Sequence, residues 1–324
     1  MNGAYALVML VVTPTLAMAT EQILTVNTEN DSYTNSGDDN YTNGLRVAWL
    51  DASFKPPAVA EWLADQLPVL DATKPMLVQY SLGQNMYTPK DITRATAQPN
   101  DRPWAGFLYG SMALTSGDRE QVDDVELNVG IVGPSALAGE AQRLIHRLGD
   151  YRKPRGWDNQ LHDEPALNLM MQRRWPTLWE ATVADTAFYL SPHVGAAVGN
   201  VYTHAATGVT LRWDSRADAV IDNPMRVRPS PPGTGYFQTS PHPVVSLFVG
   251  AEGRAVARNI FLDGNTFRDS PHVNKKNLVA DLQAGTMLTY DRFQAGYTVV
   301  YRTQEFYGQP SGEMFGGFNF AVKF

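Results

Sequence analysis

The chain is predicted to be an all-β protein: a transmembrane antiparallel β-barrel of about twelve strands with a short extracellular loop helix. Apolar and polar residues alternate with a period of two along most of the chain, as between Val125 and Ile131. These runs reach about ten residues, which matches a tilted strand that crosses a bilayer. The last run ends on Phe324, and this terminal aromatic resembles the C-terminal signal of bacterial outer-membrane barrels.

Aromatic residues near the predicted strand ends also favour the barrel, because an interfacial girdle would place them there. They are Trp49, Trp104, Tyr109, Trp175, Trp213, Tyr290 and Tyr301. The alternative is a soluble secreted β-sandwich that binds carbohydrate. Alternation alone does not separate the two, since the apolar face points inward in a sandwich and outward to lipid in a barrel.

Twelve strand-like runs can be placed in order, and single-chain bacterial barrels have an even number. They cover residues 22–30, 42–53, 76–87, 104–116, 122–133, 165–175, 185–198, 202–214, 244–256, 276–290, 293–304 and 314–324. With both termini periplasmic, the connections outside the cell are 31–41, 88–103, 134–164 and 305–313. Asp291 and Arg292 form an expected tight periplasmic turn. The long connections 54–75 and 215–243 also fall on the periplasmic side, where turns are usually short, so either both are insertions or the count is wrong by one.

Composition excludes several classes of protein. The 324 residues carry a net charge of −7 and no cysteine, which excludes disulfides and zinc–thiolate sites. The acidic balance argues against nucleic acid as a partner. Residues 1–19 are expected to be a signal peptide, with an apolar run followed by Ala17 and Ala19, although a short buried helix is the alternative. Residues 20–324 would then form the barrel, which is expected to be a monomer because a closed sheet has no free edge.

One connection has helical character instead of strand character. Residues 136–148 have helical composition and spacing, with Ser135 as the expected N-cap. Gln142 and His146 are four residues apart and would share one face, and Leu137, Leu144 and Leu148 can contact the barrel or lipid. A helix over the barrel mouth would present His146 to the rim as a general base. The alternative is a structural or solvent-exposed histidine.

Oxygen donors gather in the first predicted hairpin. Asp31, Asp38 and Asp39 lie among asparagines that include Asn30, and such hard donors suit Ca²⁺. The spacing does not match an EF-hand, so a polar turn is the alternative. Glu29 and Glu164 are each either a further metal ligand or a plain rim carboxylate. A hydrolase of this kind would use an activated water, because no G-x-S-x-G motif is present.

Five blocks, in order from the first strand to the middle of the chain, resemble the lipid A 3′-O-deacylases of Gram-negative outer membranes, the LpxR-like family. They are Asn30-Asp31-Ser32-Tyr33, Tyr41-Thr42-Asn43-Gly44, Gly83-Gln84-Asn85-Met86-Tyr87-Thr88-Pro89, Arg102-Pro103-Trp104-Ala105-Gly106, and Gln142 and His146 through Gly156-Trp157-Asp158-Asn159-Gln160. The resemblance implies a barrel in the bacterial outer membrane, with an active site facing the cell surface between the wall and a loop helix.

The resemblance also implies a function: Ca²⁺-dependent hydrolysis of the 3′-linked acyloxyacyl ester of lipid A, the lipid of lipopolysaccharide. Asn30, Asp31 and Thr42 match the family's rim residues, and Gln142 and His146 match its helix residues. Asp31 would hold Ca²⁺, with Glu164 as a candidate second ligand, and His146 would deprotonate water. The basic residues Lys90, Arg94 and Arg102 are candidate contacts for lipid A phosphates, or else solvated loop charges. A non-catalytic barrel, structural or a narrow channel, is the alternative function.

Overall fold

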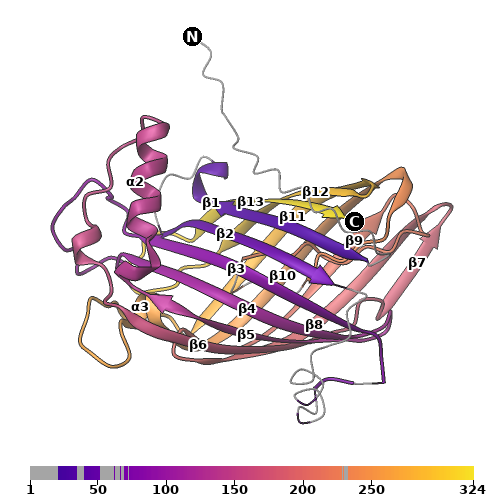
Figure 1. Ribbon diagram of the computed structural model, residues 1–324, viewed down its shortest axis with the longest axis horizontal. Coiled ribbons are helices and arrows are strands. Elements are labelled where there is room, and N and C mark those ends of the chain that lie inside the picture. The colour runs from indigo at the N-terminus through magenta and orange to yellow at the C-terminus, as the bar shows by residue number, and fades with distance from the viewer. Residues whose placement is uncertain are drawn as a thin grey trace.

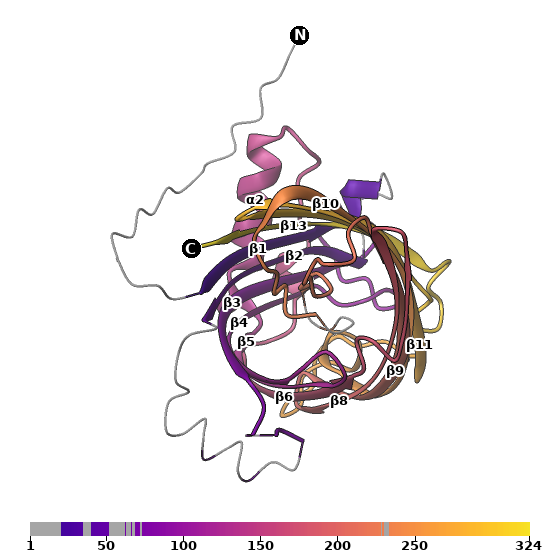
Figure 2. The same ribbon diagram turned by 90° about the vertical axis from the view of Figure 1, so that its right-hand side faces the viewer.

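The computed structural model describes residues 21–34, 40–51, 62, 66, 69–71, 73–227, 229 and 233–324. They form a thirteen-stranded antiparallel sheet curved into a barrel (Figures 1 and 2). β1 pairs with β13 and β6 pairs with β8, so the sheet closes on itself. The ring has twelve strands, because β7 pairs with β8 alone. The predicted barrel is confirmed, whereas the predicted signal peptide, residues 1–19, lies outside the described residues.

The strands lie close to the predicted runs, with two differences. The strands are β1 (Gln22–Asn30), β2 (Asn40–Asp51), β3 (Met76–Thr88), β4 (Ala105–Gly117), β5 (Val122–Val132), β6 (Glu164–Arg174), β7 (Trp179–Val183), β8 (Thr186–Gly199), β9 (Tyr202–Asp214), β10 (Ser240–Asn259), β11 (Leu278–Asp291), β12 (Phe293–Arg302) and β13 (Glu313–Lys323). The short β7 was not predicted. β10 has 20 residues and extends past both predicted ends. The expected tight turn is present, with Asp291 in the left-handed region at φ 51°.

The helices are short and lie in the connections. They are η1 (Asp31–Thr34), η2 (Pro134–Ala136), α2 (Ala138–Leu148), η3 (Trp157–Asn159) and α3 (Ile260–Asp263). The N-cap of α2 is Leu137 and not the predicted Ser135. Ser135 instead donates from its backbone N and its Oγ to the Asp163 carboxylate, at 2.7 and 2.8 Å, and so fastens the two ends of the β5–β6 connection. Among the described residues, no helix is long and apolar enough to cross a membrane.

The two faces of the wall have opposite chemistry. On β1, Thr25, Asn27 and Glu29 are buried in the lumen, whereas Leu24 is exposed on the outside. A polar inside with an apolar outside is typical of a membrane barrel and not of a soluble sandwich. Of the seven aromatics expected in a girdle, Trp49, Tyr290 and Tyr301 are exposed and Trp175 and Trp213 are partly exposed.

The other two aromatics of the expected girdle were assigned wrongly, because both are buried. Trp104 lies against Trp157, with ring centroids 5.0 Å apart. Tyr109 stacks on Phe107 in the lumen, with ring centroids 4.6 Å apart. The strand-end position of an aromatic therefore did not decide which face of the wall it occupies.

The lumen is filled. At the α2 end an aromatic cluster closes it, where Tyr87 stacks on Phe261 of α3 at 4.1 Å and bonds to the Tyr202 hydroxyl. Next come paired charges such as Arg46 with Glu126, at 3.0 Å. Two cavities in this part of the lumen measure about 30 and 20 Å³. Each of them can hold about one or two waters.

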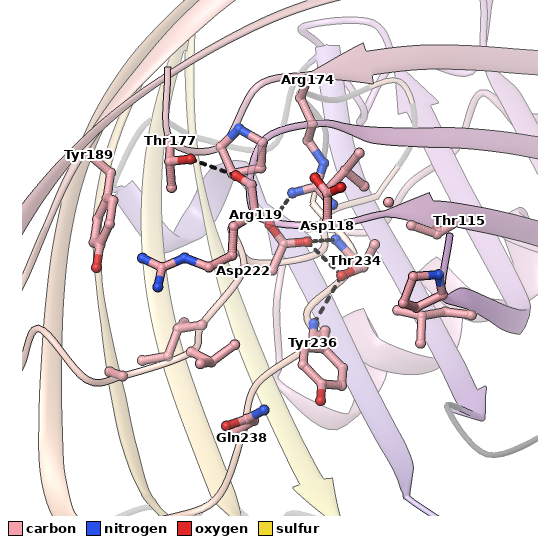
Figure 3. A pocket seen from close by; sticks show the side chains of 18 of the residues that line it. Thr115, Asp118, Arg119, Arg174, Thr177, Tyr189, Asp222, Thr234, Tyr236 and Gln238 are labelled. Atoms are coloured by element: carbon pink, nitrogen blue, oxygen red, sulfur yellow. Dashed lines mark hydrogen bonds and ion pairs between the residues drawn. The ribbon is translucent and has the colours of Figure 1, made fainter. Parts of the chain in front are cut away.

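The connection between β9 and β10 was predicted as residues 215–243 and covers residues 215–239 in the structure. Its described part enters the lumen from the opposite end, and we call this connection the luminal segment. Its described part bonds to inward side chains of several strands: Arg226 to Glu29, Thr234 O to Gln79, and Asp222 to Arg174. The strand count was therefore correct, and this long connection is an insertion that fills the barrel. At the mouth opposite α2 it borders a cavity of about 500 Å³, where Asp222 and Thr234 face Arg174 (Figure 3). The other long connection, 54–75, falls mostly outside the described residues.

Candidate functional site

Helix α2 stands on the outer side of the wall, over β3 and β4. Gly106 of β4 alternates with the luminal Phe107, so it faces outward. A Cβ at Gly106 would lie 2.6 Å from the Ala138 Cβ, so the helix contacts the strand backbone there. Gln84 of β3 also donates from its Nε2 to the Ala136 carbonyl at 2.7 Å. The helix is therefore fixed to the outside of the barrel at one rim (Figure 1).

At the same end of the barrel, η1 folds over the outer face of β13 (Figure 1). Tyr33 contacts Phe318 edge-to-face at 5.1 Å, and Thr34 Oγ1 donates to the Met314 carbonyl at 3.0 Å. Asp31 is the first residue of η1 and is 1 % exposed. In the order of the sheet, only β1 and β2 separate the strand under η1 from the nearest strand under α2.

The outer faces of β1, β2 and β3 carry polar residues between η1 and α2. Asn30 pairs in register with Asn43, one residue beyond the inward-facing pair of Glu29 and Gly44, so both asparagines face outward. Asn30 Oδ1 accepts from Ser32 N at 2.8 Å. Thr42 sits in a bulge of β2, and its Oγ1 lies 2.6 Å from the Thr88 Oγ1. This bulge breaks the alternation that sequence periodicity assumes.

His146 and Gln142 lie on α2 as the four-residue spacing predicts. His146 Nδ1 lies 2.5 Å from the Arg152 carbonyl oxygen. Because a carbonyl oxygen only accepts hydrogen bonds, Nδ1 carries the proton and Nε2 is the ring atom that can accept one. Gln142 is buried, and its Oε1 accepts from Trp157 Nε1 at 2.7 Å. Leu137, Leu144 and Leu148 are more than half exposed, so they are not buried against the barrel, and their contact with lipid stays a prediction.

The donors near η1 fit Ca²⁺ in type. Asp31 supplies a carboxylate, Asn30 and Asn43 supply amide oxygens, and hard oxygens of these kinds are what Ca²⁺ selects. The described residues contain no group of three or more His, Cys, Asp or Glu side chains that could hold a metal, so the site would depend on amide and backbone oxygens beside one carboxylate. Asp38 and Asp39, also expected as donors, lie outside the described residues.

Glu164 does not belong to this donor set, and its pairing with Asp31 on one metal is corrected. It begins β6, five strand steps from β1, which is about 24 Å along the wall at ~4.8 Å per step. Its Oε2 accepts from Thr266 N at 2.7 Å and from Asn265 Nδ2 at 3.1 Å, and its Oε1 accepts from Asn200 Nδ2 at 2.9 Å. Glu164 therefore fastens three connections to one another inside the rim. Glu29, the other carboxylate considered as a ligand, faces the lumen and bonds to Arg226.

The three basic residues expected to meet phosphate differ in exposure. Lys90 and Arg94 are exposed on the connection before β4, and Ile92 of this connection belongs to the same buried cluster as Ala138 of α2. Arg102 is 1 % exposed, and its Nη2 lies 2.8 Å from Glu305 Oε2. Burial lowers the pKa of Arg102, but the Glu305 carboxylate and others raise it by more, so the guanidinium stays charged. Arg102 is thus buried in an ion pair with Glu305 and is not an exposed cation of the rim.

Asn43 was expected among the oxygen donors of the first hairpin, and it shares the outer face with Asn30. Two residues of this region were not selected from the sequence: Thr88, which contacts Thr42, and Trp157, which donates to Gln142. Both belong to the blocks that carry the family resemblance. Their positions within those blocks could therefore have indicated them as site residues. Periodicity could not indicate that Thr88 meets Thr42, because a bulge interrupts the alternation there.

An apolar outer wall, a filled lumen and a polar rim under a loop helix define the class: a membrane β-barrel with chemistry at one rim. The family described as "Outer membrane protein LpxR" matches residues 4–324. The chain therefore belongs to the LpxR family of bacterial outer-membrane proteins.

One solved structure shares the fold. LpxR from Salmonella typhimurium is similar with a TM-score of 0.74 and 17% identity, covering 93% of this chain and 100% of that chain. The β domain of the Bordetella autotransporter BrkA reaches a TM-score of 0.42 at 9% identity, covering 94% of this chain and 98% of that chain. No curated protein sequence gives a significant match.

Proposed function

We propose that the protein is a lipid A deacylase of the outer membrane, in which His146 activates a water that hydrolyses the 3′-linked acyloxyacyl ester with the help of Ca²⁺. The active site faces the cell surface, and the substrate is lipid A within lipopolysaccharide. The family and the rim chemistry support this reading together. The enzyme acts as a monomer, because the wall closes through β1 and β13 without a partner strand.

The observation that carries the proposal is the fixed tautomer of His146. Its Nδ1–H is held by the Arg152 carbonyl at 2.5 Å, so the ring is oriented and Nε2 is the basic atom. A histidine in this state is the usual general base near neutral pH. The neighbouring Gln142, oriented by Trp157, places a polar amide on the same helix face.

The reaction balances with this one base. A water proton passes to His146 Nε2 while the water oxygen attacks the ester carbonyl carbon. The bond from that carbon to the 3′ oxygen then breaks, and the leaving oxygen takes the proton back from Nε2. The products are a free fatty acid and a 3′ hydroxyl on the sugar.

The oxygen donors Asp31 and Asn30 would hold the Ca²⁺. A bound Ca²⁺ supplies positive charge that polarises the ester carbonyl and stabilises the oxyanion. The Asn30 Oδ1 accepts hydrogen bonds from the backbone N and from the hydroxyl of Ser32, so Asn30 would bind the metal only after the Ser32 hydroxyl has released this oxygen. Lys90 and Arg94 lie exposed beside α2, where they would contact the phosphates of lipid A.

Mass spectrometry of lipid A tests the proposal. Purified protein is folded in detergent and incubated with hexa-acylated lipid A, with added Ca²⁺ or with EDTA. We expect a species that lacks the 3′ acyloxyacyl group in the Ca²⁺ sample alone. Asp31→Asn removes the proposed carboxylate ligand at nearly constant volume, so it should abolish the product at low Ca²⁺.

The matched control is Asp118→Asn, which makes the same chemical change in the connection between β4 and β5 at the opposite end of the barrel. This variant should retain wild-type turnover. Lipid A of unchanged mass in every sample, with a folded protein on a heat-modifiability gel, would instead support a non-catalytic barrel.

A further inference from the structure

The luminal segment reaches the wall directly behind the candidate site. Arg226 Nε donates to Glu29 Oε1 at 2.8 Å, and Val227 N donates to the same oxygen at 3.3 Å. Glu29 immediately precedes Asn30 and Asp31 in the chain. Both ionic side chains are buried, with 6 % of Arg226 and 3 % of Glu29 exposed.

The same two residues of the segment also contact β2. Gly44 is the register partner of Glu29, and a Cβ there would lie 2.9 Å from Val227 Cγ1 and 1.9 Å from the Tyr41 hydroxyl. The next pair outward is Asn30 with Asn43, whose side chains lie on the opposite face of the wall. The thickness of one sheet therefore separates the luminal segment from the rim residues.

Arg226 is held from two further sides. Its Nη1 donates to Gln283 Oε1 at 3.2 Å, and its guanidinium lies 5.6 Å from the ring centroid of Phe315. The Phe315 ring in turn contacts Tyr41 at 5.0 Å. The guanidinium thus contacts β11 and β13 and forms an ion pair with Glu29 of β1.

We propose that Arg226 and Glu29 are positioning residues: from inside the barrel, their ion pair fixes the β1 end that carries Asn30 on its outer face and leads directly into Asp31 of η1. The expected loss of deacylation rests on the proposed function, whereas the effect of the ion pair on the end of β1 does not. Without the ion pair the end of β1 gains freedom, and the rim donors lose their alignment with the α2 face that carries His146. A misplacement of about 1 Å in a catalytic site can cost on the order of 10²-fold in rate.

The experiment uses the absence of cysteine in the chain, so that one label can report on the site. A nitroxide is attached at Ser32→Cys, an exposed position of η1, and its mobility is measured by electron paramagnetic resonance. The label is read in four backgrounds: unchanged, Glu29→Gln, Arg226→Met and the double variant. Glu252→Gln is the matched control, because Glu252 is equally buried in the lumen and bonds to His193 of β8 at 2.9 Å.

We expect the label to become more mobile in Glu29→Gln and in Arg226→Met, and no more mobile in the double variant than in either single one. Glu252→Gln should leave it unchanged. Deacylation should fall about 10²-fold in the same variants, with the larger loss at low Ca²⁺, and Arg226→Lys should restore part of it because the positive charge returns. All variants are compared as folded protein on a heat-modifiability gel.

Two results would overturn the inference. One is a label equally immobile in all backgrounds. The other is a mobile label with wild-type deacylation and wild-type Ca²⁺ dependence. If the label is released but even the unchanged protein deacylates nothing, the ion pair still fixes the end of β1, and it is the proposed function that fails.

Discussion

The lumen and the outer rim are both polar, yet their polar groups are arranged in opposite ways. In the lumen, charges are buried and matched: Asp281 lies 2.8 Å from Arg254 and accepts two bonds from Arg302. At the rim, Asp31 is buried near amides and hydroxyls, whereas cations such as Lys90 and Arg94 are exposed on the connection before β4. Matched charges inside fasten strands to one another, whereas the oriented groups outside can act on a ligand. The polar content of a region therefore does not show whether that region of a barrel binds a ligand or only stabilises the fold.

The largest contrast should come from two histidines. His146→Gln removes the proposed base on α2, so deacylation should fall by about 10²–10⁴-fold while the folded band persists on heating. His193→Gln breaks a luminal pair with Glu252 and should lower the temperature of unfolding without changing turnover in the folded protein. Rates of fatty-acid release and heat-modifiability gels measure both. Equal turnover in the two variants would contradict a catalytic role for His146 at the rim and a purely structural role for His193 in the lumen.

The next contrast compares two carboxylates by stability. Asp281→Ala leaves two buried arginines without their shared partner and should cost about 3–5 kcal/mol of unfolding free energy. Asp218→Ala breaks an exposed pair with Arg216 and should change the unfolding free energy far less, because water screens an exposed pair. Urea unfolding in lipid vesicles gives both values. A similar, small loss in both would mean that the luminal pairs do not fasten the barrel.

A smaller effect is expected from two outward-facing glycines. Gly106→Ala brings a Cβ to 2.6 Å from Ala138 and should push α2 off the wall, with about a tenfold loss of deacylation. Gly253→Ala meets nothing within 4 Å and should have no effect. The comparison is made by initial rates on the same micelles. An inactive Gly253→Ala would show that any added methyl group on the wall disturbs the enzyme.

The smallest effect concerns pH at the mouth opposite α2. The hydrogen bond from Lys74 holds the pKa of Asp118 at about 2, below its ordinary 3.8. A depressed pKa stabilises the fold above the ordinary value, and this contribution is lost as the pH falls from about 4 to about 2. Wild type should therefore exceed Asp118→Asn slightly in stability at neutral pH, and the difference should vanish near pH 2. Unfolding is measured at several pH values. A stability difference between wild type and Asp118→Asn that increases as the pH falls would contradict this prediction.

Periodicity predicted the barrel well, because each wall strand must alternate between lipid and lumen. It could not show that residues 215–239 turn into the lumen, since a polar, proline-containing stretch reads as an ordinary loop until its partners, such as Glu29 and Arg174, are known. It missed β7, whose five residues are too few for a clear period. The expectation of an aromatic girdle, and not periodicity, assigned Tyr109 to the outside, although its ring lies in the lumen.

The candidate site was reached by resemblance more than by pattern. The spacing of Gln142 and His146 on one helix face followed from helix geometry. That Asn30 and Thr42 share the outer face did not, because a bulge at Thr42 shifts the phase of β2. Glu164 was chosen for its charge, and only the order of strands around the ring separates it from Asp31.

The exposed leucines of α2 have a consequence for how a substrate arrives. Leu144, Ile145 and Leu148 are all more than half exposed on a helix fixed to the outer wall. For the proposed deacylase, the lipid would not have to leave its leaflet to reach this helix. Acyl chains would reach the helix by lateral diffusion within the membrane. The encounter rate would therefore depend on the surface density of lipid A and not on the concentration of a dissolved substrate.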